Sequence, residues 1–244
     1  MNDPDADGWR ASAAAWVRDM GPAEGGGDYG RRHILDAPML ARATRRQRTR
    51  ALDVGCGEGR FCRMLAARGI PAIGIDPTPE LIDEAIARDP AGDYRLGTAE
   101  ALDCPDDSFD LVVSYLTLID IPDAERAIAE MARVLAPGGS LLIANLSGLA
   151  TANAGQSWLE DKAGTARFPI DNYLSAWPYR ASWRGIDIVN WHRPLSLYMR
   201  ACLAAGLTLV HYDEPAPDAD GPADRAARYR RAPWFVTMEW DAPG

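Results

Sequence analysis

The segment ALDVGCGEGRF, residues 51–61, indicates the fold and the kind of site more directly than any other part of the chain. Residues 51–54 have the composition of a short buried strand, and three glycines that alternate with other residues follow them. Phe61 then begins a helical pattern. Glycine permits a tight turn and lets a ligand approach the backbone closely, and the first N–H groups of a helix are free to bind it. The segment therefore predicts a ligand-binding loop between a strand and a helix.

The spacing of these glycines distinguishes between ligands. The dinucleotide fingerprint G-x-G-x-x-G/A would place Arg60 at its third glycine, where a large side chain opposes close packing of helix on strand. Asp53 and Glu58 add negative charge where a pyrophosphate would lie, which favours a ligand with a positive centre and an amine. A P-loop is excluded because no Gly-Lys-Ser/Thr follows. A nicotinamide-dependent oxidoreductase is therefore the weaker alternative.

Outward from this loop, short apolar runs alternate with helical stretches, which predicts a parallel sheet covered by helices on both faces. Strands are expected at 51–54, 72–75, 94–96, 109–115, 141–146, 207–212 and 234–240. Helices are expected at 61–68, 79–88, 123–135 and 195–205. Thr78 is a candidate N-cap, Asp120 and Asp123 are assigned to a turn and an N-cap, and the glycines at 138–139 are expected to end a helix.

The predicted fold is α/β: a doubly wound, Rossmann-like, seven-stranded sheet, mostly parallel with the last strand antiparallel. Residues 1–50 form an N-terminal helical segment, 51–146 the Rossmann-like core, and 194–244 a C-terminal helix with edge strands. No helix is expected between the last two strands. Residues 147–193 are rich in aromatic side chains and are predicted to be a cap, because a long insertion after a strand typically covers a site at the carboxyl ends of the strands.

Composition excludes several functions. The formal net charge is −9, from 26 basic and 35 acidic residues, so no nucleic-acid partner is expected. The basic run at 42–50 is interpreted as a solvated helix end whose arginines suit the helix dipole. The three histidines and four cysteines do not cluster, which argues against a metal site. Without an apolar leader or a long apolar run, we expect a cytoplasmic protein with no membrane partner. The oligomeric state is not indicated.

Five ordered motifs lead to a known family. They are LDVGCGEGRF, GIDPTPELI, GTAEAL, DDSFDLVVSYLTL and ARVLAPGGSLLIANL, which together cover residues 50–147. In order and spacing they resemble the motifs of class I S-adenosylmethionine-dependent methyltransferases. The later HRPLSLYMRACLAAGLTLVHYDEP resembles the C-terminal part of the small-molecule, methyltransferase type 11 branch, which is similar to the ubiquinone and menaquinone methyltransferases.

The resemblance implies S-adenosylmethionine as methyl donor, S-adenosylhomocysteine as product and a set of binding residues. It assigns the methionine portion to the first motif: Asp53, Gly55, Cys56 and Gly57. It assigns the ribose to Asp76, and the adenine to Pro77, Thr98, Ala99 and Glu100. Many relatives carry Asp where Thr98 stands, so either Thr98 or Glu100 would meet the adenine amino group. Ser114 and Tyr115 follow the fourth strand, where the cofactor and the substrate of this family meet. Tyr29 and Arg31 resemble a segment that closes over the cofactor, and Arg31 is a candidate partner of its carboxylate or a surface ion pair.

The sulfonium makes the methyl group electrophilic, so positioning supplies much of the rate and a base is needed only for a nucleophile that carries a proton of high pKa. His192 and Tyr115 are the catalytic candidates, although a structural hydrogen bond and plain packing are the alternatives. The predicted substrate-binding aromatics are Tyr115, Trp177, Tyr179, Trp183 and Trp191.

The sequence therefore predicts methyl transfer to an O or N nucleophile of a small, aromatic or partly apolar acceptor. C-methylation of a quinone-like acceptor and a non-catalytic cofactor-binding protein are the alternatives.

Overall fold

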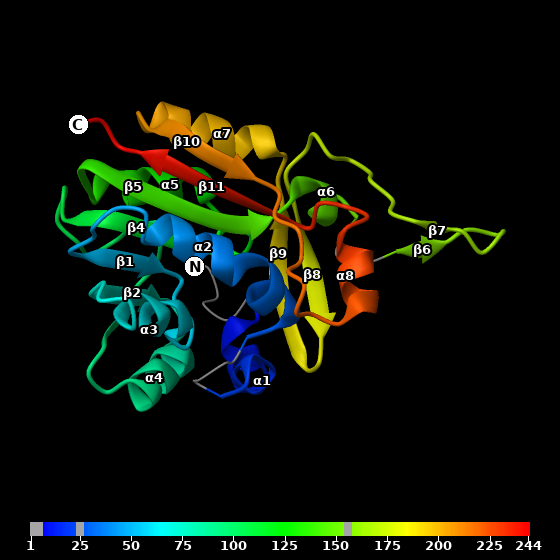
Figure 1. Cartoon of the computed structure of the whole chain (residues 1–244), viewed down its shortest axis with the longest axis horizontal. Helices are drawn as coiled ribbons and strands as arrows, with labels where there is room; N and C mark the ends of the chain where they lie inside the picture. Colours follow the sequence, from blue (N-terminus) through cyan, green and yellow to red (C-terminus); the bar gives the residue numbers. More distant parts are fainter. Residues whose placement is uncertain (1–6, 23–26, 154–157) are drawn as a thin grey trace.

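A seven-stranded sheet organises the chain, in the order β10-β11-β5-β4-β1-β2-β3 (Figure 1). The computed structural model describes residues 7–22, 27–153 and 158–244. The strands are β1 (Ala51–Val54), β2 (Ala72–Asp76), β3 (Asp93–Leu96), β4 (Phe109–Tyr115), β5 (Leu135–Leu146), β10 (Thr208–Asp213) and β11 (Phe235–Asp241). The five neighbouring strands β5, β4, β1, β2 and β3 pair in parallel, and β11 is antiparallel to both of its neighbours. The predicted doubly wound fold with an antiparallel last strand is confirmed.

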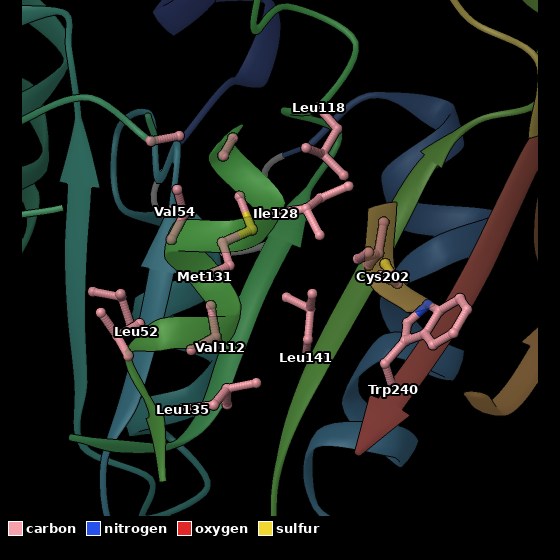
Figure 2. Close-up of a cluster of buried hydrophobic side chains, with 14 of the residues drawn as sticks. Leu52, Val54, Val112, Leu118, Ile128, Met131, Leu135, Leu141, Cys202 and Trp240 are labelled. Atoms are coloured by element: carbon pink, nitrogen blue, oxygen red, sulfur yellow. The ribbon is translucent and has the colours of Figure 1, made fainter. Parts of the chain in front are cut away.

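Helices cover both faces of the sheet, because strand side chains alternate between the faces. One face packs on η1 (Arg31–Leu35, a π-helix), α2 (Asp36–Ala43) and α3 (Arg60–Ala66). Beside α3, α4 (Pro79–Arg88) packs on β2 and β3. The other face packs on α5 (Ala124–Arg133) and α7 (Leu195–Ala204). Figure 2 shows this second layer, in which Leu52, Val112 and Leu141 from three strands meet Ile128 and Met131 of α5.

Several local predictions differ from the structure. The connection between β10 and β11 contains α8 (Ala223–Tyr229), a helix that the sequence prediction left out. Helix α5 ends at Arg133, and the glycines at 138–139 lie inside β5, where the register with β4 shifts. Thr78 occupies the N-cap position of α4 without a side-chain capping bond. Asp123 does cap α5, by accepting from the N–H of Arg126 at 3.0 Å.

In the part of the predicted cap that the structure describes, the regular elements are α6 (Gly148–Thr151) and two antiparallel hairpins. One pairs β6 (Leu159–Glu160) with β7 (Ala166–Arg167) and projects away from the sheet (Figure 1). The other pairs β8 (Trp177–Trp183) with β9 (Ile186–His192), and α1 (Trp9–Met20) packs on β9. This second hairpin therefore joins the N-terminal helix to the end of the sheet. Within the described ranges, no helix has the length and apolarity needed to span a membrane.

The basic run at 42–50 forms partly buried ion pairs with the last strand rather than a solvated helix end. Glu239 of β11 is only 1% exposed and accepts from Arg42 Nε at 2.6 Å and from Arg45 Nε at 2.7 Å. Arg48 is also buried; it donates to Ser140 Oγ at 2.9 Å and to the Asp110 carbonyl at 2.6 Å. The interpretation from sequence was wrong because the acidic partners lie about two hundred residues away in the chain, on the last strand.

We expect Glu239→Ala to lower the free energy of unfolding by about 3 to 5 kcal/mol, because it leaves the buried guanidinium of Arg48, 3.6 Å away, without its carboxylate and removes the partner that Arg42 and Arg45 share. Glu80→Ala is the matched control: its side chain is 44% exposed and pairs with Arg10, so its cost should stay under about 1 kcal/mol. Urea unfolding of both variants measures the difference. Equal losses would show that burial does not set the strength of this network.

Candidate active site

A cavity of about 500 Å³ lies at the carboxyl ends of β1, β2 and β4, where the strand order reverses. Its floor is the glycine loop after β1, and its walls come from the turns after β2, β3 and β4. Helix α1 contributes Trp9 and Trp16. The other lining residues are Asp7, Arg31, Gly55, Gly57, Asp76, Pro77, Thr78, Leu81, Gly97, Thr98, Ala99, Glu100, Tyr115, Leu116, Thr117, Asp120, Ile121 and Pro122. Most residues of the predicted cofactor set therefore gather around one cavity.

The glycine loop brings its backbone to the cavity floor. Gly55 and Gly57 both have positive φ, at 75° and 54°, and the Gly57 N–H donates to Asp76 Oδ2 at 2.9 Å. The Thr78 N–H donates to the other oxygen of Asp76, also at 2.9 Å. Asp76 therefore ties the loop after β1 to the turn after β2, while its carboxylate still lines the cavity.

A smaller recess of about 40 Å³ adjoins the cavity and is lined by Asp53 and Cys56, among others. Asp53 is 1% exposed, and its Oδ1 has no hydrogen-bond partner in the described part of the chain. Burial, reinforced by the charges of Asp76 and Glu58, raises the pKa of Asp53 to about 7. A hydrogen bond from the Cys62 thiol lowers this pKa and offsets only part of the rise. Such an acidic, incompletely bonded pocket suits a cationic group that donates hydrogen bonds.

Arg31 stands where the cavity meets the recess and lines both. Its guanidinium carbon lies 4.8 Å from the ring centre of Trp16 and 5.7 Å from that of Tyr115, and it pairs with Asp28 at 2.6 Å. The Tyr115 hydroxyl donates to Asp36 Oδ1 at 2.8 Å, and burial raises its pKa well above the usual value. Tyr115 is thus a lining residue whose proton is already committed to a carboxylate.

Two residues of the predicted cofactor set lie elsewhere. Tyr29 packs between His33 and Tyr229, with ring centres 4.9 and 5.0 Å away, and it does not line the cavity. Ser114 is fully buried within β4. Neither position offers contact with a ligand in this cavity.

His192 lies outside the cavity lining, at the end of β9. Its Nε2 donates to the Tyr173 carbonyl at 2.9 Å, so Nδ1 of the neutral ring accepts from the Thr151 hydroxyl at 2.8 Å. Burial lowers the pKa of His192, which favours the neutral ring. Both nitrogens are used, and the geometry supports the structural alternative rather than the predicted base.

The four aromatic residues of the cap that were predicted to bind substrate are also absent from the described lining. Trp177 packs against His192 at 5.2 Å, and Trp183 is 36% exposed with its Nε1 on Asp19. Trp191 lies under the guanidinium of Arg193, and Tyr179 is half-buried on β8. Besides Tyr115, the aromatic walls come from Trp9 and Trp16. Their spacing of seven residues places them on one face of α1, and this pattern could have indicated from sequence that they share a surface.

Comparison with known proteins places this geometry in a family. A model of the methyltransferase domain matches residues 52–143. The chain is 30% identical over 185 residues to the malonyl-[acyl-carrier protein] O-methyltransferase of Salmonella typhimurium. This alignment covers 73% of this chain and 72% of that protein. The chain belongs to the class I S-adenosylmethionine-dependent methyltransferases. It is an enzyme that uses S-adenosylmethionine, as the five sequence motifs predicted.

Further relatives of this methyltransferase agree on the fold. The structure of an S-adenosylmethionine-dependent methyltransferase from Mesorhizobium loti superposes with a TM-score of 0.72 at 24% identity, covering 98% of this chain and all of that one. The malonyl-[acyl-carrier protein] O-methyltransferase of Erwinia billingiae is 34% identical over 145 residues. That match spans only 58% of each protein, so the methyltransferase shares about half the length of this relative.

Proposed function

We propose that the methyltransferase binds the methionine end of S-adenosylmethionine in the recess and the adenosine in the cavity. The observation that carries this proposal is Asp53 Oδ1, a buried acceptor that has no partner among the described residues and suits the donor's ammonium group. Arg31 would pair with the donor carboxylate, and Asp76 would accept from the ribose hydroxyls. Pro77 and Leu81 offer apolar contact for the adenine. The residues present therefore fit the donor.

We further propose that the acceptor is a small molecule that receives the methyl group on an oxygen. Space for it lies between Tyr115, the loop at 116–122 and the two tryptophans of α1. The relatives named O-methyltransferases support oxygen over carbon or nitrogen. Those names also make a carboxyl oxygen of a carrier-bound acyl group the second candidate acceptor. The aromatic walls support a partly apolar acceptor.

Catalysis then depends mainly on position. S-adenosylmethionine supplies an activated methyl group, and the protein aligns the acceptor oxygen with the carbon–sulfur bond. The glycine loop, Asp53 and Asp76 fix the donor from one side. Residues of the 116–122 loop and of α1 line the other side, where the acceptor would be held.

Calorimetric titration with S-adenosylhomocysteine, with NADH in parallel, tests the donor site without the acceptor. We expect micromolar binding of the former and none of the latter. Asp76→Ala should weaken binding by about 100-fold, because it removes charge-assisted hydrogen bonds from a buried site. Glu84→Ala, on α4 and paired with Arg88 away from the cavity lining, is the control. Unchanged affinity in Asp76→Ala, or binding of NADH by the wild type, would contradict the proposal.

A further inference from the structure

The end of β9 holds the acceptor side of the cavity in place. Arg193 is 3% exposed and donates to three carbonyls of the loop after β4: Leu118 at 2.8 Å, Ile121 at 2.5 Å and Pro122 at 2.8 Å. The N–H of Trp191 donates to the Ile119 carbonyl at 2.6 Å. The β8–β9 hairpin therefore acts on the cavity through this loop rather than through its own aromatic rings.

The loop presents Asp120 to the cavity. Asn190 Nδ2, also at the end of β9, donates to Asp120 Oδ1. Oδ2 has no hydrogen-bond partner within the described ranges, and Asp120 is not fully buried. One oxygen is thus fixed by the hairpin, and the other is free for a ligand.

The charges around Asp120 come from several elements. Arg31 of η1 attracts its carboxylate, whereas Asp76 of β2 and Asp7, just before α1, repel it. Tyr179 of β8 and Tyr198 of α7 lie close enough for the Asp120 charge to raise their pKa values, although burial is the larger cause for both. Asp120 is therefore within electrostatic reach of both Arg31 and Asp76.

Resting on the proposed function, we propose that Asp120 is the catalytic proton acceptor, held by the positioning residues Asn190 and Arg193, and that the acceptor presents a hydroxyl group. The acceptor O–H bond breaks, and its proton goes to Asp120 Oδ2. The oxygen forms a bond to the methyl carbon, the carbon–sulfur bond breaks, and its electron pair stays on sulfur. Asp120 later releases the proton to water.

The lining favours a hydroxyl over a carboxylate. Its described acidic side chains are Asp7, Asp76, Glu100 and Asp120, and Arg31 is its one described cation, already paired with Asp28. A carboxylate acceptor would meet like charges and would need no base. A neutral hydroxyl avoids that repulsion and needs a base.

Burial raises the pKa of Asp120 well above its usual value, and Arg31 and Asn190 oppose that rise. A sulfonium cation in the cavity favours the ionised carboxyl. Binding of the methyl donor would thus prepare the base, whereas the neutral product would not.

Infrared difference spectra test this without any acceptor. Both ligands should remove the protonated-carboxyl band of Asp53, because both carry the ammonium group. Across a pH series, we expect S-adenosylmethionine to remove a second protonated-carboxyl band at lower pH than S-adenosylhomocysteine does. The second band should be missing in Asp120→Asn and present in the control variant Asp123→Asn, which changes only the α5 cap. A second band on which the two ligands act alike at every pH, while both bind, would overturn the inference and leave the proposed function intact.

Turnover assays use phenols and aliphatic alcohols on one side and malonyl thioesters of a carrier protein on the other. We expect methylation of a hydroxyl, with kcat reduced about 100-fold or more in Asp120→Asn and binding of S-adenosylhomocysteine, which lacks the sulfonium charge, little changed. Asn190→Ala should move the acidic limb of the pH–kcat profile to higher pH, because it removes a hydrogen bond that lowers the pKa of Asp120. Turnover of the malonyl thioester alone, or full activity of Asp120→Asn on a hydroxyl, would overturn the inference. Failure of the wild type to bind S-adenosylhomocysteine would instead overturn the proposed function.

Discussion

Asp53→Asn is expected to weaken the binding of S-adenosylmethionine by about 100-fold or more and, in the same protein, to raise the free energy of unfolding at pH 8. The loss of affinity follows if, as proposed, the buried carboxylate that a neutral amide replaces faces the donor's ammonium group. Calorimetry with S-adenosylhomocysteine, which keeps that ammonium group, measures it.

The gain in stability follows from the cost of ionising Asp53 in the free protein. The pKa lies at about 7 in the folded chain and at 3.8 for an ordinary carboxyl. The folded state therefore holds its proton more tightly, and its stability falls as pH rises between these values. A tenfold shift of a proton equilibrium corresponds to about 1.4 kcal/mol, so the fall is roughly 4 kcal/mol. The neutral amide of Asn avoids this fall, but its buried N–H donor is left unpaired, which costs about 1 to 3 kcal/mol. The net gain in stability at pH 8 is therefore about 1 to 3 kcal/mol.

The same titration predicts that wild-type affinity for S-adenosylhomocysteine falls as pH drops below about 7, where Asp53 takes up its proton. The Asn variant should show no such dependence. Asp93→Asn, at the half-exposed start of β3, controls for the loss of a carboxylate and should retain wild-type affinity. An affinity that is flat from pH 6 to 8, or an Asn variant that binds normally, would show that Asp53 does not face the ammonium group.

The sequence could predict that the residues proposed for the donor gather at one cavity, because they lie next to regular elements. Asp53 and Asp76 lie at the carboxyl ends of the strands predicted at 51–54 and 72–75, and parallel strands bring these ends to one edge of the sheet. The glycines of the loop after β1 are needed for the positive φ angles of its turn, and a glycine pattern is visible in the sequence. Strand, loop and helix in succession fix these positions without long-range information.

The acceptor half could not be read in this way. Asp120 was assigned to a turn, because nothing local shows that Arg193 and Asn190, some seventy residues later, hold that loop against the cavity. His192 and Trp177 have the composition of a site, but His192 bonds to Thr151 and to a backbone carbonyl, and the Trp177 Nε1 donates to another backbone carbonyl. Composition alone does not reveal whether a side chain faces a ligand or the protein.

Gly55→Ala is expected to abolish measurable cofactor binding and to lower the free energy of unfolding by about 3 kcal/mol or more. Gly55 has φ of 75°, which costs a side chain about 1 to 2 kcal/mol. In addition, its Cβ would overlap Thr117, lying 2.6 Å from Oγ1 and 2.9 Å from Cβ. Rotation of the Thr117 side chain cannot clear the overlap, because the threonine Cβ does not move with χ1. The loop or the wall after β4 must then shift, at a further cost of about 1 to 3 kcal/mol.

Gly69→Ala separates the two contributions, since Gly69 has nearly the same φ, 74°, and no atom within 4 Å of the added Cβ. It should cost only the backbone strain, about 1 to 2 kcal/mol, and leave binding of S-adenosylhomocysteine unchanged. Urea unfolding and calorimetry of both variants measure the difference. If the two variants lose equal stability and both still bind, the glycine at position 55 serves only the turn. A larger loss confined to Gly55→Ala would mean that it serves the close contact between the glycine loop and Thr117, and thus the shape of the cavity floor on which the donor lies.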